Sequence, residues 1–570
     1  MDDKQQYLHN LRHTAAHVIA QAVLQLYPGT KITIGPVTET GFFYDFLPTQ
    51  SFKEEDLVKI ETRMREIIAK NYKMTGKQIS KDEARKLWAD NPFKLELIEG
   101  IPGDMVGAYT QGEFTDLCRG GHLEYIGEVQ HFKLTSISGS YWRANRDGQA
   151  LQRITGIAFA TQADMDDYLK RLEDAEKYDH RRLGKELELF SFHDEAPGMP
   201  FFLSKGLTLF NGLVDYMRKI RGPVDYQEIR TPLILNEQLW KTSGHYDHYK
   251  ENMYFTKIDE GFSCVKPMNC PGSVLVYKER PRSYRELPLR LSEFGYVHRH
   301  ELSGTLHGLF RVRAFIQDDQ HIYATIDQLG GEVERLLAMA SRLYKAFEFN
   351  KIIFMLSTRP EKSMGSDEMW EKSTGALQSA LERNNIAYTI EEGDGAFYGP
   401  KIDIKIEDAM GRLWQCGTVQ VDFNLAINFD ATYIAADQSR QRPVVVHSVI
   451  YGSLERFIGV ILEHFKGRLP FWISPVQARI LAISEKQADY AQAAAATLRA
   501  AGLRVEIDNS GDQISAQIRR AQLDKIPWML VIGQKEVDQN TVTLRDLEGK
   551  QEFGQTLAGL LSRAKALMEV

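Results

Sequence analysis

Cysteines are scarce in this chain, and long apolar runs are absent. The 570 residues include four cysteines, Cys118, Cys264, Cys270 and Cys416. Four are too few for a disulfide framework in a chain of this length, so we expect a reducing compartment, the cytoplasm. No run of about 18 apolar residues occurs, which excludes a membrane-spanning helix. The opening MDDKQQYLHNLRH has no apolar core, so we expect no secretory signal.

A basic surplus is also absent. The 70 Lys and Arg residues are outnumbered by 77 Asp and Glu residues, and the net charge is −7. Nucleic-acid binders usually carry a basic excess, because contacts to phosphate supply much of their affinity. Composition therefore does not predict an RNA partner, and any contact with RNA must come from local patches.

Apolar periodicity divides the chain into an α+β multidomain protein. Residues 13–27 predict a helix that Pro28-Gly29 closes. The charged segment 163–190 has no Gly or Pro before Gly184 and has apolar residues at helical spacing, which predicts a solvated helix between two domains. Beyond it, short alternating or apolar segments predict a large, mainly antiparallel sheet with flanking helices. These segments are YQEIRTPLIL, EFGYVHRHE, RVRAFIQDDQHIY, KIDIKIED, RLWQCGTVQVDF and RPVVVHSVIY.

The tail of the chain has a different pattern. ARILAIS, LRVEID, WMLVIG and TVTLRD alternate with helical segments near 489–501 and 515–524, which predicts a small α/β layer domain. We therefore expect an α+β domain over 1–165, a linker helix over 166–190, an antiparallel-sheet domain over 191–473 and the α/β domain over 474–570.

One predicted strand, RVRAFIQDDQHIY, has an unusually polar face. Such a face is costly to bury unless it holds a ligand, although a solvated sheet face is the alternative. With the segment before it, the hairpin presents arginines suited to planar phosphate recognition. Strand alternation places on this face Arg311, Arg313, Phe315, Gln317, Asp319 and His321.

Several segments carry a family resemblance. The run FGYVHRHELSGTLHGLFRVRAFIQDDQHIY resembles motif 2 of class II aminoacyl-tRNA synthetases, and the threonyl enzymes in particular. The segment TPLIL, which contains Pro232, resembles motif 1, and YGSLERFIG resembles motif 3. The segment KPMNCPG resembles a segment of the threonyl enzymes. Matching segments follow one another in order across nearly the whole chain. The resemblance, to the bacterial type, implies a threonine–tRNA ligase (AMP-forming) with an N-terminal editing domain, a class II catalytic domain and a C-terminal anticodon-binding domain.

The resemblance assigns roles in ATP binding. Arg299 would hold the α-phosphate, Arg311 and Arg456 the remaining phosphates, and Glu301 the adenine side. Magnesium is implied with ATP, because bridging its phosphates normally requires the ion. Since the threonine carboxylate attacks the α-phosphorus, positioning and charge neutralisation supply most of the acceleration.

The resemblance also implies one zinc ion per subunit, on Cys270, His321 and His447. Their separations, 51 and 126 residues, match no short zinc pattern, and His447 in VVVHSVIY by itself indicates a core histidine. Three protein ligands leave a fourth position open. Threonine could chelate there through its amino and hydroxyl groups, and valine would be rejected by a factor on the order of 10⁴.

The threonine pocket follows from the same resemblance. Gln415 and Gln420 have opposite parity on their strand, so a bulge near Gly417 is needed to turn both inward. Asp319 and Gln317 would receive the ammonium group. The implied pocket consists of Gln317, Asp319, Tyr398, Gln415 and Gln420.

Serine calls for a second site. It differs from threonine by one methyl group, which is worth roughly 10- to 200-fold, so hydrolytic editing is expected. His13 and His17 share a helix face, while Gly120-Gly121 argues against a regular helix at Cys118 and His122.

This HxxxH and CxxxH set resembles the editing domain of threonyl and alanyl synthetases. Lys94, Tyr44 and Asp116 match further positions of the threonyl version. We expect metal-free hydrolysis of seryl-tRNA(Thr) with a histidine as base; a second tetrahedral zinc site is the alternative.

Further expectations concern the ends of the chain and its partners. Glu536 and Arg545 match anticodon-reading positions, but Gly511 and the acidic stretch Asp546-Leu547-Glu548 depart from the family. The ubiquitin-like N-terminal domain of many relatives is lacking. Class II enzymes usually dimerise through motif 1, so we expect a homodimer around Phe210–Asn236. The expected partners are tRNA(Thr), ATP and L-threonine, with no membrane.

Other functions are less consistent with these residues. A synthetase-like regulator that binds threonine or RNA would be favoured by loss of an ATP arginine or a zinc ligand, and none is lost. A ligase acting on a carrier protein would not need the tail and the editing domain. A protease of the HExxH type is excluded because Thr14 follows His13.

Overall fold

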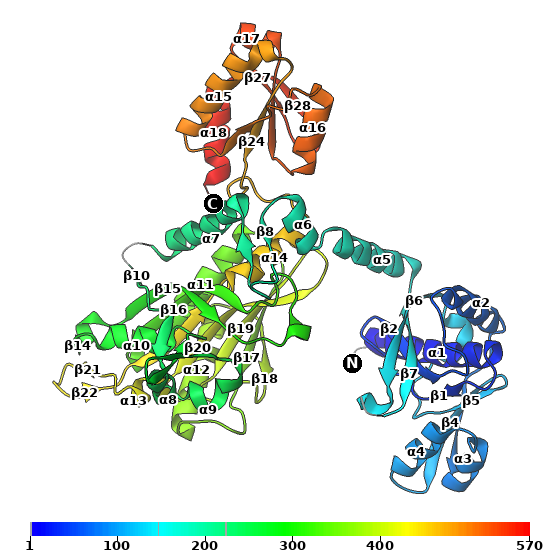
Figure 1. Ribbon diagram of the computed structural model, residues 1–570. Coiled ribbons are helices and arrows are strands. Elements are labelled where there is room, and N and C mark those ends of the chain that lie inside the picture. Colours follow the sequence, from blue (N-terminus) through cyan, green and yellow to red (C-terminus); the bar gives the residue numbers. More distant parts are fainter. Residues whose placement is uncertain (1–2, 146–147, 223–224, 570) are drawn as a thin grey trace. The chain divides into compact units, whose positions relative to one another are not determined.

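The computed structural model describes residues 3–145, 148–222 and 225–569, shown in Figure 1. The chain divides into two compact units, 1–173 and 174–570. In the described part, no helix is both long enough and apolar enough to cross a bilayer.

The first unit is built on one long helix, α1 (Asp3–Leu26). The helix begins ten residues before the predicted start and ends at Leu26, just ahead of Pro28, which cannot continue it. It packs on β2 (Gly41–Leu47) and β7 (Ala150–Phe159), in a sheet of order β1-β2-β7-β6 (Figure 1). The sheet is completed by β1 (Lys31–Ile32) and β6 (His131–Tyr141), and α2 (Asp56–Ala69) packs on β6.

The same unit contains a smaller sheet and, between its strands in sequence, the helix that carries Lys94. Its strands are β3 (Thr75–Ser80), β4 (Met105–Gln111) and β5 (Phe114–Leu117), and α3 (Lys81–Leu87) packs on β3 and β4. Helix α4 (Pro92–Gly100) is capped by Asn91, whose side chain accepts hydrogen bonds from the backbone N–H groups of Phe93 and Lys94. The cap fixes the first turn of α4 and with it the position of Lys94.

The segment predicted as a single linker helix forms two helices. α5 (Gln162–Lys177) has one buried residue, Met165, as expected for a solvated helix. α6 (His180–Glu186) begins after Asp179, whose carboxylate accepts the Arg181 backbone N–H. An Asp cap starts a new helix rather than extending the old one, so a continuous helix over 163–190 was wrong.

The second unit contains the eight-stranded sheet, of order β10-β15-β16-β23-β20-β19-β17-β18. All its pairings are antiparallel except the outermost pair at each edge, which confirms the predicted mainly antiparallel sheet. The strands are β10 (Gln227–Glu228), β15 (Leu289–His298), β16 (Ala314–Ala324), β17 (Ile352–Ser357), β18 (Tyr388–Glu391), β19 (Lys401–Glu407), β20 (Leu413–Asp422) and β23 (Val444–Val449).

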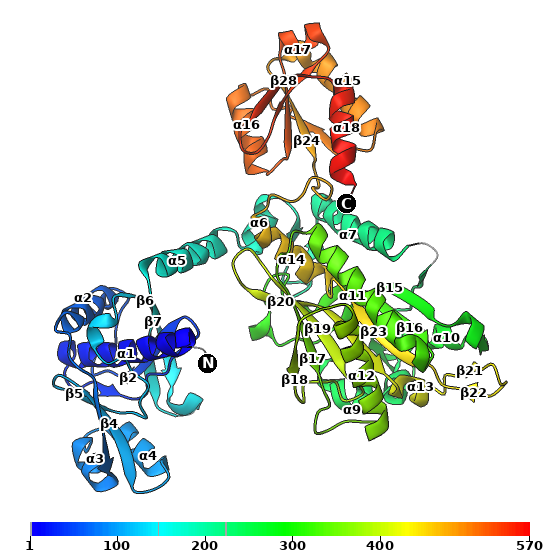
Figure 2. The ribbon, with the colours of Figure 1, turned by 180° about the vertical axis from the view of Figure 1, so that it is seen from behind.

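Helices bury the apolar side of this sheet. α11 (Leu329–Ala346) packs on β20 and β23, α12 (Asp367–Arg383) on β19 and α14 (Leu454–His464) on β16 (Figure 2). α7 (Ser204–Arg221) contacts α11 and α14. The main apolar core lies between these helices and the strands.

Local details of the sheet differ from the prediction. YQEIRTPLIL forms two short strands, β10 and β11 (Ile234–Asn236), because Pro232 has no N–H for a ladder. β15 ends at His298 and β16 starts at Ala314, so Arg311 and Arg313 lie in the loop before the strand and not on its face.

The bulge expected near Gly417 is confirmed. The pairing of β19 with β20 shifts between Gly417 and Gln415 and skips Cys416.

The last 97 residues contain the predicted α/β layers. The sheet, of order β25-β24-β26-β27-β28, has α15 (Ala488–Ala500) and α18 (Leu557–Met568) on one side and α16 (Ile514–Leu523) on the other (Figures 1 and 2). Sequence reasoning missed α17 (Gln534–Gln539), β28 (Gln551–Gln555) and α18. The predicted strands are β24 (Ala478–Ala482), β25 (Val505–Ile507), β26 (Trp528–Ile532) and β27 (Val542–Arg545).

Candidate active site

A cavity of about 370 Å³ opens beside the polar side of the large sheet. Its walls come from the loop after β15, from β16, from the bulged part of β20 and from α14. It collects all four residues expected to bind ATP and two expected in the amino-acid pocket. These are Arg299, Glu301, Arg311, Arg456, Gln317 and Gln415.

The cavity carries an excess of positive charge. Arg311 pairs with Glu301 at 2.9 Å, which leaves the charges of Arg299 and Arg456 without a carboxylate partner among the described residues. Burial, and then the two neighbouring arginines, lower the pKa of Arg456. Crowded guanidinium groups repel one another, so an anion with several charges, such as a polyphosphate, would stabilise them.

Backbone carbonyls aim two of these arginines. Nε of Arg299 donates to the Pro267 carbonyl at 3.3 Å, and its guanidinium lies 5.1 Å from the centre of the Phe315 ring. Nε of Arg456 donates to the Phe310 carbonyl at 3.0 Å. In both cases the bond uses the nitrogen nearest the aliphatic stem, so the terminal nitrogens remain for a ligand.

The Cys–His–His group is assembled by strand register. His321 of β16 pairs with His447 of β23, and His447 in turn pairs with Gln420 of β20, so these three side chains form a row across the sheet. Cys270 is the first residue of α10 (Cys270–Lys278). The candidate ligand atoms of the two histidines and the cysteine all lie within 4.8 Å of one another.

The donor set fits zinc. Nε2 of His321 is buried and has no hydrogen-bond partner in the described part of the chain. Burial raises the pKa of Cys270, but hydrogen bonds from His245, His321 and His447 hold that pKa well below its usual value. The thiolate is the form that binds metal.

Two residues beside this group were missed. Nε2 of His447 lies 3.0 Å from Asp422 Oδ2, the kind of carboxylate contact that orients a metal-binding imidazole. His245 is buried in α9 (His245–Tyr249). Neither stands at a metal-ligand spacing in the sequence, so only a family alignment could have signalled them.

The amino-acid residues lie between the metal group and the arginines. Gln317, Asp319 and His321 alternate along one face of β16, so Gln317 and His321 are separated by about 13 Å of strand. Asp319 is buried and accepts a hydrogen bond from Asn269 at 3.0 Å, and burial raises its pKa. A cation next to this carboxylate would be stabilised.

Tyr398 lies in the turn before β19, and its ring centre is 6.0 Å from that of His447. Its hydroxyl donates to Gln420 Oε1 at 3.1 Å. The expected pocket is thus brought together in the second unit, with Gln415 at its arginine end.

The first unit brings together the four histidine and cysteine residues among the seven expected editing residues. Sγ of Cys118 lies 3.3 Å from His13 Nε2 and 3.5 Å from His122 Nε2. The His17 and His122 ring centres are 4.5 Å apart. Gly120 and Gly121 have φ of +100° and +86°, so the CxxxH segment is a loop, as its glycines predicted.

Burial sets the protonation states of this cluster. Burial lowers the pKa of His13 and His17, and it lowers the pKa of His122 to about 2. Burial also raises the pKa of Cys118 to about 11. Without a metal ion, the imidazoles are therefore neutral at neutral pH and the thiol is protonated. The ligand atoms of His13, His17, Cys118 and His122 also lie within 4.8 Å of one another, so the cluster could hold a metal ion once the thiol loses its proton.

A buried ion pair adjoins the cluster. Lys94 Nζ lies 2.5 Å from Asp116 Oδ1, and the Tyr44 hydroxyl donates to Asp116 Oδ2 at 2.6 Å. The cation is therefore fixed in place. Sequence reasoning missed His9, whose ring centre lies 6.1 Å from that of His13, one turn away on α1.

The two expected anticodon residues lie on neighbouring elements, α17 and β27. Glu536 closes the first turn of α17 by accepting from the Gly533 N–H and the Thr543 hydroxyl. Arg545 ends β27, and its buried Nε has no partner within the described structure. A cavity of about 440 Å³ in this region is lined by Gly511, with Asp508 and Gln517, and not by Glu536 or Arg545.

Comparison with family models matches three parts of the chain. The "Threonyl and Alanyl tRNA synthetase second additional domain" matches residues 106–155. The "tRNA synthetase class II core domain (G, H, P, S and T)" matches 254–465, and the "Anticodon binding domain" matches 477–567. The core match contains the arginine-lined cavity and the Cys–His–His group, and together with the antiparallel sheet it defines a class II aminoacyl-tRNA synthetase.

Individual relatives narrow this class. The threonine–tRNA ligase of Acetivibrio thermocellus is 53% identical over 537 residues, 94% of this chain and 84% of the relative. That of Clostridium botulinum (strain Okra) is 52% identical over 94% of this chain and 85% of the relative. The chain belongs to the threonine–tRNA ligase family.

A solved structure agrees with this assignment. The crystal structure of the RNA binding domain of threonyl-tRNA synthetase from Cryptosporidium parvum has a TM-score of 0.66 and 44% identity, and the match covers 68% of this chain and 98% of that one.

Proposed function

We propose that this chain attaches L-threonine to tRNA(Thr) at the expense of ATP and hydrolyses seryl-tRNA(Thr) in its first unit. One observation carries the proposal: strand β16 contributes His321 to the Cys–His–His group and Gln317 to the wall of the arginine cavity, so both lie along one polar face of the sheet. An amino acid can react with a nucleotide only if the two binding regions hold the reacting atoms next to each other.

The first step forms threonyl-adenylate. A threonine carboxylate oxygen bonds to the α-phosphorus, the bond to the bridging β-oxygen breaks, and pyrophosphate leaves with that electron pair. Arg299, Arg311 and Arg456 neutralise the charge on the phosphates, Glu301 contacts the adenine side, and Asp319 and Gln317 hold the ammonium group. Magnesium accompanies ATP, as class II synthetases require in general. A tRNA hydroxyl then attacks the carbonyl carbon, and AMP leaves.

Selection of threonine falls to the metal group. Cys270, His321 and His447 would hold zinc, which when bound supplies an open coordination position for the amino and hydroxyl groups of the substrate. Tyr398, Gln415 and Gln420 complete the pocket. Valine has the shape of threonine without the hydroxyl, so it leaves the site's polar partners unsatisfied.

Amino-acid-dependent ATP–pyrophosphate exchange tests this function. We expect exchange with threonine, weaker exchange with serine by roughly 10- to 200-fold, and a loss on the order of 10⁴ with valine. Equal exchange with valine, or exchange with an unrelated amino acid only, would contradict the proposal.

Editing is tested by the double substitution of Cys118→Ala and His122→Ala. Removing the thiol and a neutral imidazole should leave threonine charging unchanged and raise the accumulation of seryl-tRNA(Thr) at least about 10-fold, since a positioned base contributes about 10² or more. His131→Ala, in the same unit but outside the cluster, is the matched control. Unchanged serine accumulation would contradict the assignment.

The number of zinc ions separates the two possible chemistries of the editing cluster. One equivalent per chain, unchanged by Cys118→Ala, supports metal-free editing. A second equivalent that this substitution removes supports the alternative zinc site.

The remaining proposals concern organisation and partners. For the domains we retain the bounds 1–165, 166–190, 191–473 and 474–570 as a proposal, with two helices in the linker, and we propose that Glu536 and Arg545 contact the anticodon. A homodimer forms around Phe210–Asn236. Leu233 and Ile234 in this segment are exposed by 38 and 46%, and Leu207, just before it, by 50%. The four free cysteines suit a reducing cytoplasm.

A further inference from the structure

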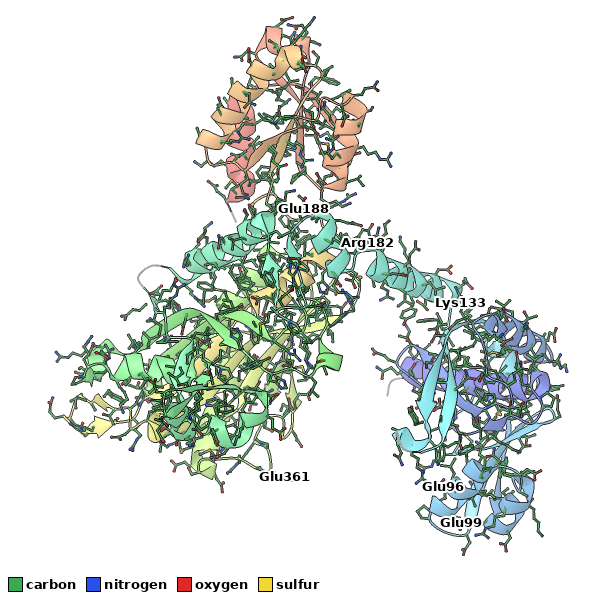
Figure 3. All side chains as sticks on the ribbon, viewed as in Figure 1. Glu96, Glu99, Lys133, Arg182, Glu188 and Glu361 are labelled. Atoms are coloured by element: carbon green, nitrogen blue, oxygen red, sulfur yellow. The ribbon has the colours of Figure 1, made fainter. Side chains whose placement is uncertain are left out.

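A buried histidine lies behind the arginine cavity and outside every group described so far. His180, the first residue of α6, is fully buried, with 0% of its surface exposed. Arg182, two residues further along the same helix and labelled in Figure 3, is exposed and pairs with Glu186. A buried polar ring needs partners on both nitrogens, and His180 has them on two different elements.

The hydrogen bonds of His180 define its tautomer. The Leu309 backbone N–H donates to Nε2 at 2.9 Å. A backbone N–H only donates, so Nε2 carries no proton and Nδ1 carries it. Nδ1 then donates to Glu463 Oε1 at 2.6 Å, and the His180 backbone N–H donates to the same oxygen at 2.9 Å.

The distances within the group of Asp179, His180 and Glu463 fit a hydrogen bond and not a bound metal ion. The 2.6 Å between His180 Nδ1 and Glu463 Oε1 is a direct hydrogen bond, and two ligands of one ion at about 2.1 Å each would be held further apart. His180 is therefore a connector between α14, which carries Glu463, and the loop that carries Leu309.

The loop is shaped to meet this ring. Gly308 has φ of +48°, and a Cβ on it would lie 2.2 Å from His180 Nε2. Gly459 lets α14 pack closely against the Phe310 and His180 rings, since a Cβ there would lie 2.9 Å from the Phe310 ring and 3.5 Å from His180 Cδ2. The rings of His180 and Phe310 have centres 4.1 Å apart. Two glycines thus permit the close approach of the loop, the ring and the helix.

The same turn reaches the nucleotide cavity. Phe310 and Arg311 follow Leu309 and line the cavity, and the Phe310 carbonyl accepts the hydrogen bond that orients Arg456. Displacing the turn would therefore move the carbonyl that aims one arginine and the backbone that carries another.

We propose that His180 is a positioning residue for nucleotide binding: through Nε2 it holds the turn 307–311, and through that turn it orients Arg311 and Arg456. The inference rests on the proposed function only in taking ATP as the occupant of the cavity.

Two substitutions separate the ring's two contacts. Asn in place of His180 keeps a donor near the position of Nδ1 and loses the acceptor for Leu309, whereas Gln can place an acceptor near the position of Nε2. In the full chain, the Kd for ATP with Mg²⁺, measured by calorimetry, should rise about 10-fold in His180→Asn and stay within about 3-fold in His180→Gln. Arg182→Ala should have no effect.

A second pair of variants tests the turn without altering the histidine. Gly308→Ala places a methyl group against the ring and should also weaken ATP binding about 10-fold. Gly304→Ala is the matched control in the same loop, because a Cβ there meets no atom within 4 Å. Equal Kd values in this pair would overturn the inference even if His180→Asn does not fold.

The outcomes are distinct. Equal Kd values for His180→Asn and His180→Gln, or for Gly308→Ala and Gly304→Ala, would overturn the inference. If the native chain binds ATP but attaches no threonine to tRNA, the proposed function fails. The Kd values for ATP of the variants then still test the role of His180. If the native chain binds no ATP, both fail.

Discussion

Cys270→Ala should reduce threonine-dependent pyrophosphate exchange by about 10³ or more. It should also abolish the preference for threonine over valine, which we expect to be on the order of 10⁴ in the unsubstituted chain. The substitution removes the Cys270 thiol, whose pKa, despite burial, is lowered by hydrogen bonds from three histidines. The two remaining ligands, His321 and His447, would bind zinc only weakly. Zinc content and exchange with the two amino acids are the measurements.

Cys264→Ala is the matched control for this prediction. Cys264 is also fully buried, but it packs with Trp240 and Met253 and not with the metal group. It should lose neither zinc nor selectivity. Removing zinc with a chelator should reproduce the effect of Cys270→Ala, and added zinc should reverse it. A Cys270 variant that still rejects valine would contradict the metal's role in selection.

Arg299→Ala should lower the rate of adenylate formation by about 10² to 10³, the usual cost of removing one preorganised donor at a centre of developing charge. Its guanidinium is held by the Pro267 carbonyl and the Phe315 ring, so its position is set before ATP arrives. Single-turnover formation of threonyl-adenylate measures the effect.

Arg285→Ala serves as the surface control for Arg299. Arg285 is exposed and lies outside the cavity, next to Tyr284. It should leave the rate unchanged. If Arg299→Ala formed threonyl-adenylate at the normal rate but attached no threonine to tRNA, Arg299 would act in a later step of the reaction.

Much of the fold was predictable because strand and helix periods are local properties. The antiparallel sheet and the α/β tail followed from alternation and from element order. The bulge near Gly417 followed from the opposite parity of Gln415 and Gln420, which the family resemblance had placed in one pocket. The predicted elements were wrong where a single residue sets the end of a helix or a strand. Asp179 starts a second helix within 163–190, and Pro232 splits one predicted strand in two.

The candidate site depended far more on family resemblance. His321 and His447 are neighbours because β16 pairs with β23, and no local pattern encodes that register across 126 residues. His245 and His180 carry no spacing signal at all. Their partners come from distant segments, so their surroundings exist only once the chain has folded.

Charging of a tRNA(Thr) transcript with labelled threonine by the purified chain tests the central claim most directly. The account predicts ATP-dependent attachment of threonine and no lasting attachment of serine. Threonine-dependent exchange without attachment would mean activation without transfer and would direct attention to Gly511 and the acidic stretch after Arg545. Failure of both reactions would contradict the account and favour a threonine- or RNA-binding regulator.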